Sequence, residues 1–277
     1  MTGAPLVSVV VPIHDQADLL AAALRTVLAQ RLDDIEVLVS GDGCRDASEA
    51  VATGTGDARV RWLGFPKEPG YGYANRARAI ATARGRYIAY LAPDDLWADD
   101  HLSRLTAAAQ TGPLDFVFSK PIAVRADGIL LPHFAPFDLG SSRSAAWTRL
   151  RVYFLSPSQA LHTRELHDRV GGWRTPPLRH GDVDLWHRFG KAGARTGYLA
   201  CPTVVRLPSY AFAARPAQRR ALHERLAAQL VAGELDLAAL RWPAHHRIGG
   251  WGRDLGRIAK ARWRTYSRFA WDTVLGR

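Results

Sequence analysis

The segment VSVVVP at residues 7–12 is an almost continuous run of β-branched apolar residues that ends at a proline. This pattern predicts a strand that is buried on both faces, as in a parallel sheet. Comparable apolar runs follow at 35–39, 60–63 and 87–91, and the stretch at 18–30 has apolar residues at helical spacing. Strands that alternate with helices in this way predict an α/β fold with a mostly parallel sheet flanked by helices.

The composition is typical of a soluble globular protein. Of the 277 residues, 47% are hydrophobic and 23% are charged, and no run approaches the ~20 apolar residues needed to cross a bilayer. The opening run at 6–13 lacks a basic leader, so it predicts a strand and not a signal peptide. With only Cys44 and Cys201, we expect neither a disulfide framework nor a structural zinc site, and a cytoplasmic location is the default.

Acidic residues directly follow three of the predicted strands. Asp15 ends the sequence PIHD at 12–15, Asp42 stands between two glycines, and Asp94 follows the run at 87–91. Ligands of parallel sheets bind outside the carboxyl ends of the strands, so these residues mark the first candidate site. An acid in this position can accept a hydrogen bond from a nucleobase or a ribose hydroxyl, and it can equally well be a turn former.

Two adjacent carboxylates, Asp94 and Asp95, follow Pro93 in this region. Such a pair is costly to hold side by side unless it is solvated or neutralised. A divalent cation that bridges to a diphosphate would neutralise it, and oxygen ligands suit Mg²⁺ or Mn²⁺. The alternative is that Asp95 caps a helix that starts near Leu96.

A third acidic segment, HGDVDLWHR at 180–188, follows a Gly-Gly-Trp sequence and predicts a short helix. Asp182 could cap this helix and do nothing more. An inverting transferase, however, needs one base on the face opposite the leaving group, which takes the proton of the attacking hydroxyl. Asp182 is the candidate for that base.

These segments, in this order, resemble the family 2 glycosyltransferases of the GT-A fold over roughly residues 6–207. The opening SVVVPIHD is similar to the family's first strand, and IEVLVSGDGCRD is similar to its second strand and uracil-contacting loop. ARGRYIAYLAPDDLW is similar to the strand that leads into the D-x-D metal motif. VGGW and GDVDLWHR are similar to the acceptor-side segment, whose E-D pair carries the catalytic base.

The resemblance implies a metal-assisted, inverting transfer of a sugar from a nucleotide-sugar, expected to be UDP-linked, to a hydroxyl of an unidentified acceptor. It implies Asp182 as general base and Mg²⁺ or Mn²⁺ held by Asp94 and Asp95. The residues it implies at the nucleotide are Pro12, His14, Asp15, Asp42, Arg76, Arg78 and Asp94. On the acceptor side it implies Ser158, Trp173 and His180, although packing explains Trp173 equally well.

The first acid of three family motifs is missing: the positions hold Gly41, Ala92 and Gly181. The second acid survives in each motif, as Asp42, Asp94 and Asp182, so we expect the core chemistry to persist. The alternative is a catalytically degenerate GT-A domain that acts as a binding or membrane-docking protein. A nucleotidyltransferase on a similar sheet fits less well, because the chain lacks that class's Gly-rich basic loop after the first strand.

The rest of the chain is less regular. Residues 114–119 and 122–125 predict a hairpin-like pair of strands, and 218–240 have a helical pattern. We therefore expect a nucleotide-sugar-binding and catalytic domain at 1–210 and a helical, basic extension at 211–277.

The end of the chain carries most of the positive charge. Residues 241–277 contain nine Lys/Arg and two Asp/Glu, which gives about two thirds of the net charge of +11. Five basic residues at 253–268 share one helical face, and Trp and Tyr residues accompany them within 251–271. This pattern favours docking at an anionic surface on the inner face of a membrane, and a helix packed on the core is the alternative. No nucleic-acid motif accompanies the charge, so nucleic acid is not an expected partner.

Overall fold

The computed structural model describes residues 3–124, 130–132, 155–175, 181–207, 209 and 212–240. The strands are β1 (Val7–Ile13), β2 (Ile35–Asp42), β3 (Val60–Phe65), β4 (Tyr87–Tyr90), β5 (Asp95–Trp97), β6 (Phe116–Val124), β7 (Leu130–Pro132), β8 (Ala160–Thr163) and β9 (Thr196–Arg206). The helices are α1 (Ala17–Leu28), α2 (Ser48–Thr53), α3 (Tyr73–Ala81), α4 (His101–Thr111), the 3₁₀ turn η1 (Pro157–Gln159), α6 (Arg164–Arg169), α7 (Gly181–Lys191) and α8 (Pro216–Val231).

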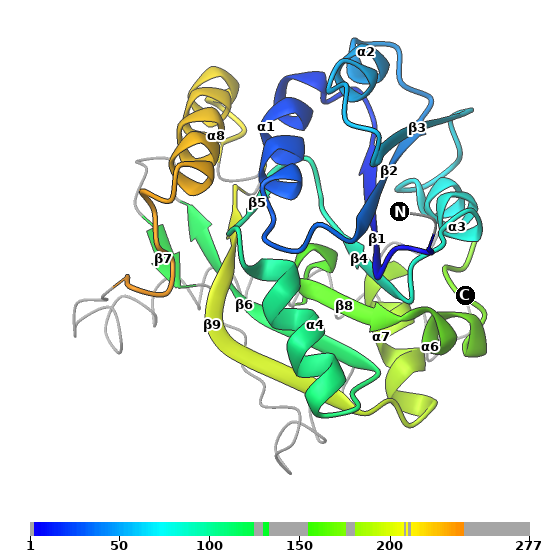
Figure 1. Ribbon diagram of the computed structural model, residues 1–277. Helices are drawn as coiled ribbons and strands as arrows, with labels where there is room; N and C mark the ends of the chain where they lie inside the picture. Colours follow the sequence, from blue (N-terminus) through cyan, green and yellow to red (C-terminus); the bar gives the residue numbers. More distant parts are fainter. Residues whose placement is uncertain are drawn as a thin grey trace. The chain divides into compact units, whose positions relative to one another are not determined.

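In the described part of the chain, the strands form one nine-stranded sheet with the order β3-β2-β1-β4-β8-β6-β9-β5, and β7 pairs with β6 (Figure 1). β1 is parallel to both β2 and β4, β2 is parallel to β3, and β6 is parallel to β9. β5, β7 and β8 run antiparallel to their neighbours. The predicted α/β class with a mostly parallel sheet is therefore confirmed.

The sheet separates two hydrophobic layers, because successive side chains of a strand point to opposite faces. Val7, Val9 and Val11 of β1 pack into one layer with the apolar faces of α1 and α4. Val10 packs into the other layer, with α3, α6 and α7 and with Trp173. All of these valines are fully buried, as the continuous apolar run predicts.

One sequence-based expectation about local structure, and one alternative, are wrong. The segment expected to be a hairpin-like pair is mostly one strand, β6, whose pairing with β9 shifts register around Lys120. A local irregularity of this kind bends the strand without ending it. Asp95 does not cap a helix either, because it opens β5, which pairs with β9, and the next helix starts only at His101.

Helix α8 lies beside α1 (Figure 1). Leu222, Leu226 and Leu230 form its buried stripe, and Arg25 of α1 forms an ion pair with Glu224. The compact unit that includes α8 extends to Ala238, while the domain boundary expected after residue 210 stays a prediction. None of the helices in the described residues is long and apolar enough to span a membrane. The basic segment at 251–271 lies outside the described residues.

Candidate active site

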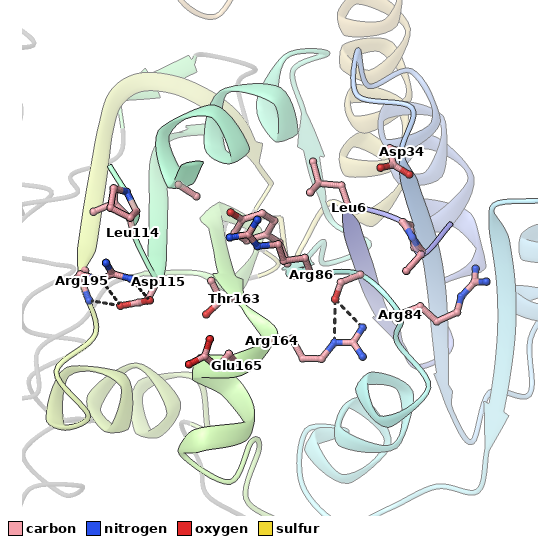
Figure 2. A pocket seen from close by; sticks show the side chains of 16 residues that line it. Leu6, Asp34, Arg84, Arg86, Leu114, Asp115, Thr163, Arg164, Glu165 and Arg195 are labelled. Carbon is pink, nitrogen blue, oxygen red and sulfur yellow. Dashed lines mark hydrogen bonds and ion pairs between the residues drawn. The ribbon is translucent and has the colours of Figure 1, made fainter. Parts of the chain in front are cut away.

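A hollow of about 480 Å³ opens at the amino-terminal ends of β1 and β4 (Figure 2). Leu6, Asp34 and Arg86, each just ahead of a strand, line it. Two of the arginines that line it already have partners: Arg164 donates a hydrogen bond to the Gly85 carbonyl, and Arg195 forms an ion pair with Asp115. None of the residues singled out by the sequence lines this hollow, so the candidate site lies at the other edge of the sheet.

The carboxyl ends of β1, β2 and β4 meet at that other edge. Ile13 of β1 is opposite Gly41 of β2, and Leu91, which follows β4, donates its N–H to the Val10 carbonyl. The segments carrying Asp15, Asp42 and Asp94 therefore leave neighbouring strands on the same side. Parallel α/β sheets bind their ligands at this position.

Asp42 is the most firmly held acid of this edge. Its carboxylate accepts hydrogen bonds from the Glu68 backbone N–H at 3.0 Å and from Asn75 Nδ2 at 2.7 Å, and it forms an ion pair with Lys67. Burial opposes its ionisation, but these donors outweigh burial and hold the pKa of Asp42 below its ordinary value. Asp42 is thus an ionised acceptor, and its contacts with Lys67 and Asn75 were not predicted from the sequence.

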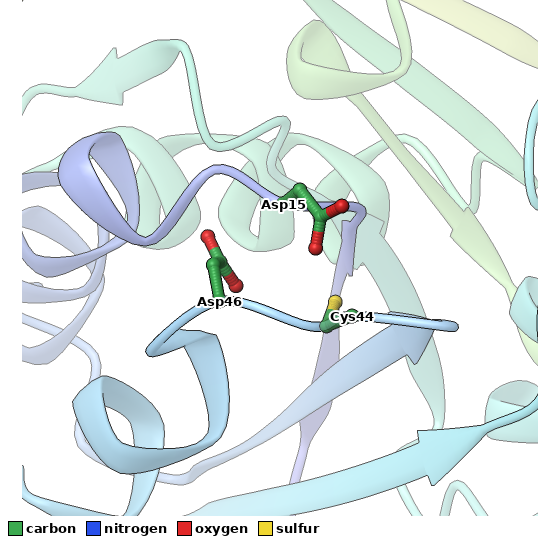
Figure 3. A group of neighbouring side chains, drawn as sticks. All are labelled: Asp15, Cys44 and Asp46. Atoms are coloured by element: carbon green, nitrogen blue, oxygen red, sulfur yellow. The ribbon is translucent and has the colours of Figure 1, made fainter.

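Asp15 belongs to a group of three candidate metal-binding side chains (Figure 3), the one such group among the described residues. Ligand atoms of Asp15, Cys44 and Asp46 lie within 4.8 Å of one another. Both carboxylates of this group already accept hydrogen bonds from the backbone: the Arg45 N–H donates to Asp15 at 2.7 Å, and the Ala17 N–H donates to Asp46 at 2.8 Å. These bonds tie the loop after β1 to the loop after β2, which gives the carboxylates a structural role.

A cationic side chain lies over an aromatic platform in the same region. The rings of Tyr73 and Trp173 stack with centroids 5.3 Å apart, and the Arg76 guanidinium lies 5.0 and 4.7 Å from the two centroids. Trp173 is buried, and its Nε1 donates to the Tyr90 hydroxyl at 3.1 Å. The Trp173 ring therefore packs in the core and supports the Arg76 guanidinium.

The charge of Arg76 is not neutralised by an ion pair with any described residue. Burial lowers the pKa of Arg76, and the nearby Tyr73, Asp182 and Asp42 act against that shift. Its Nε atom is enclosed without a hydrogen-bond partner among the described residues. A guanidinium whose donors have no partner among the described residues can bind an anionic group such as a phosphate.

The two carboxylates expected to hold a metal are each neutralised by an arginine. Asp94 forms an ion pair with Arg219 of α8, and Asp95 Oδ1 lies 3.6 Å from Arg206 Nε. Burial, partly offset by Arg206, raises the pKa of Asp95 to about 6. Ala92 at the first position of the motif offers no side-chain ligand. This donor set does not fit a divalent cation, which requires several free oxygen ligands.

Asp182 and Asp184 at the start of α7 have different surroundings. Asp184 accepts a hydrogen bond from Arg188 Nε at 2.9 Å and lies 3.5 Å from Arg174. None of the described residues hydrogen-bonds or ion-pairs with Asp182. Burial raises the pKa of the Tyr73 hydroxyl to about 12, and the nearby carboxylate of Asp182 adds to that shift. Among the described residues, Asp182 is therefore the acid of this helix that has no hydrogen-bond or ion-pair partner.

Aromatic rings occupy the space at two of the three positions that lost an acid. A Cβ atom on Gly41 would lie 2.5 Å from the Trp62 ring, and one on Gly181 would lie 2.8 Å from the Tyr73 ring. Contacts this short do not occur at real Cβ atoms, so any side chain would displace the ring. At these two positions an aromatic ring therefore occupies the space that an acidic side chain would need.

Comparison with known proteins identifies the class to which this site belongs. The sequence profile described as glycosyl transferase family 2 matches residues 8–171, more than half of the chain. The chain belongs to this family. The match, together with relatives named as glycosyltransferases, supports a glycosyltransferase enzyme and does not support the alternative of a degenerate binding domain.

Several curated relatives of the transferase share about a third of their residues with it. The succinoglycan biosynthesis protein ExoO of Rhizobium meliloti is 33% identical over 135 residues, which are 49% of this chain and 38% of that protein. An uncharacterized glycosyltransferase of Rickettsia typhi is 33% identical over 165 residues, 60% of this chain and 45% of that protein. The chain thus spans less than half the length of these two relatives.

Solved structures confirm the GT-A-like fold of the transferase. Residues 1–349 of TarS from S. aureus superpose with a TM-score of 0.60 and 17% identity, covering 88% of this chain and 72% of that one. The complex of the same TarS fragment with UDP-GlcNAc gives a TM-score of 0.58 and 17% identity, covering 87% of this chain and 69% of that one. At this identity the likeness shows the fold alone.

The remaining residues expected at the site are placed as follows. Ser158 is buried, and its Oγ accepts a hydrogen bond from the Ala92 N–H, so it supports the loop that carries Asp94. Arg78 forms an ion pair with Glu68 at 2.6 Å. Pro12 is partly buried and His14 is exposed at the end of β1, and His180 lies outside the described residues.

Proposed function

We propose that the transferase moves a sugar from a UDP-linked donor to a hydroxyl group of its acceptor, with inversion at the anomeric carbon. The observation that carries this proposal is the Arg76 guanidinium, which forms no ion pair with a described residue and is close enough to both Asp42 and Asp182 for these acids to act on its pKa. The TarS structures with UDP and UDP-GlcNAc support the choice of nucleotide. The nature of the sugar and the acceptor is left open.

The proposed chemistry is one in-line displacement. The acceptor oxygen forms a bond to the anomeric carbon on the face opposite the diphosphate, and the bond between that carbon and the diphosphate oxygen breaks. The electron pair of the broken bond leaves with the diphosphate, and Asp182 takes the proton of the acceptor hydroxyl. Arg76 would stabilise the negative charge that develops on the departing group.

The roles at the donor follow from how each group is held. Asp42, ionised and fixed by Lys67, Asn75 and a backbone N–H, is suited to accept hydrogen bonds from the nucleoside. The Mg²⁺ or Mn²⁺ that the resemblance implies at Asp94 and Asp95 does not fit the donor set of these residues, so no step of this mechanism passes through a metal. Docking of the segment at 251–271 on an anionic membrane surface stays a prediction.

A panel of nucleotide-sugars tests the proposal directly. Thermal shift should detect binding of a UDP-linked sugar, and slow release of UDP should follow when that donor is incubated with the enzyme. Asp42→Asn should weaken binding, whereas Asp57→Asn is a matched control, because Asp57 pairs with Arg59 in the turn that precedes β3. Absence of binding and of UDP release with every donor of the panel would refute the proposal.

A further inference from the structure

The C-terminal helix places a positive charge at the acid that survives from the D-x-D motif. Arg219 lies in the first turn of α8 and forms an ion pair with Asp94, a residue 125 positions earlier in the chain. Arg219 Nε also donates to the Leu207 carbonyl at 2.9 Å and Nη2 donates to the same oxygen at 2.6 Å. The guanidinium is therefore fixed in position and orientation at the end of β9.

Arg219 and its partner Asp94 are both partly buried. The side chain of Arg219 is 11% exposed and that of Asp94 is 25% exposed, so the pair borders solvent at the carboxyl edge of the sheet. Among the described residues, no acceptor is hydrogen-bonded to its Nη1. A guanidinium held in this way can donate to a phosphate oxygen while it keeps its other contacts, because its five N–H donors point in different directions.

The charge balance of the motif leaves little use for a divalent cation. In the arrangement that the resemblance implies, a dication offsets both the acids of the motif and the diphosphate. Here Ala92 has removed one acid, Arg219 neutralises Asp94, and Arg206 lies against the buried Asp95. The ion pair with Arg219 offsets the charge of Asp94 and so reduces the repulsion between this carboxylate and an incoming diphosphate, which is what a cation would do at this position.

We propose that Arg219 supplies, in place of a divalent cation, the fixed positive charge that faces the donor diphosphate, so that nucleotide binding needs no metal. This inference rests on the proposed function, since it concerns the same donor site. In the transfer step Arg219 would act beside Arg76 on the diphosphate as its bond to the sugar breaks. No proton or electron passes through Arg219, which remains protonated throughout.

If Arg219 had a purely structural role, its substitution would have different effects on stability and on UDP affinity. The ion pair and the two bonds to Leu207 also tie α8 to the core, and a tie of this kind affects the melting temperature without affecting UDP affinity. Arg219→Gln separates the two roles, because the amide can still donate to the Leu207 carbonyl but carries no charge. Arg219→Lys is the complementary variant, which keeps the charge and loses the planar fork.

The experiment is calorimetric titration of the full chain with UDP, in EDTA and in Mn²⁺. We expect the unmodified enzyme to bind UDP in EDTA, with an affinity that Mn²⁺ changes by less than about threefold. Arg219→Gln should bind UDP about tenfold or more weakly in EDTA, as expected for the loss of a hydrogen bond between charged groups. Arg219→Lys should retain an intermediate affinity. Arg220→Gln is the matched control, because Arg220 is the next residue of α8 and pairs with the half-exposed Asp18.

Different failures have different meanings. Binding of UDP only in Mn²⁺ would overturn this inference and leave the proposed function intact. Unchanged UDP affinity in Arg219→Gln, with a lowered melting temperature, would assign Arg219 a structural role and also overturn it. No binding of UDP in either condition would refute the proposed donor site and this inference with it. If Arg219→Gln does not fold, the ratio of affinities in EDTA and Mn²⁺ for the unmodified enzyme decides the question.

Discussion

The two acids at the start of α7 allow a test in which one substitution should abolish chemistry and its neighbour should reduce stability. Asp182→Asn keeps the shape of the side chain but cannot accept the proton of the acceptor hydroxyl. Loss of a general base lowers the rate by about 10² to 10⁴, which corresponds to roughly 2.7 to 5.4 kcal/mol of activation free energy. Because no described residue pairs with Asp182, the structural cost is limited to its favourable position at the helix N-terminus, about 0.3 to 1 kcal/mol.

Asp184→Asn should have the opposite profile. The Asp184 carboxylate pairs with Arg188, whose side chain is 10% exposed and donates to the carbonyls of Val170 and Gly172 at 2.6 Å each. Removing the charge weakens a hydrogen bond between charged groups, at a cost of about 1.5 to 3 kcal/mol. For a domain of this size, that cost lowers the melting temperature by roughly 3 to 12 °C. Turnover below the melting temperature should remain substantial, since Asp184 points to Arg188 and not to the ligand side.

The assay follows UDP release in the presence of the best acceptor, together with thermal melts of the same samples. We expect Asp182→Asn to lose turnover while its donor affinity and melting temperature stay near those of the unmodified enzyme. Near-full turnover of Asp182→Asn would show that the base is another residue. Loss of turnover in Asp184→Asn, without loss of stability, would show that the roles of the two acids are reversed.

Three further outcomes are expected. Asp42→Asn should weaken UDP binding about tenfold, because it removes an ionised acceptor, and calorimetry against Asp57→Asn as control measures this. The pKa of Asp42 is lowered, so its contribution to stability is fully present above the ordinary carboxyl pKa of about 4 and is lost as the pH falls through its folded value. The stabilities of the unmodified enzyme and Asp42→Asn, measured by urea titration between about pH 6 and about pH 3, should therefore converge at the acid end of this range. Deleting residues 245–277 should reduce sedimentation with anionic liposomes at low salt while the core stays folded; loss of folding would favour a helix packed on the core.

Local sequence patterns predicted the part of the fold that surrounds the donor site. The valine run of β1 and the apolar segment of β2 carry their own evidence of burial, since a strand covered on both faces has no polar alternation. The positions of Asp15, Asp42 and Asp94 at one edge then follow from the rule that parallel strands end together. The bent β6 was missed because a register shift depends on the pairing partner, which the strand's own residues do not specify.

A partial signal for Arg219 was present in the sequence. Arg219 lies three and four residues before Leu222 and His223, and the buried stripe of α8 continues through Leu226 and Leu230. A basic residue on the apolar face of a helix indicates a partner inside the protein, because an unpaired charge there would be costly. The identity of that partner could not be read from the helix itself.

The sequence by itself determined the parallel sheet, the edge at which its ligands bind, and the acids that survive in each motif, because all of these depend on residues close together along the chain. The tertiary structure alone decided what those acids contact. Asp42 is bound by Lys67 and Asn75, Asp94 by Arg219, and Asp182 by none of the described residues. The energy of a carboxylate depends on the charges and donors within a few ångströms, and folding brings these from elements that are remote in sequence.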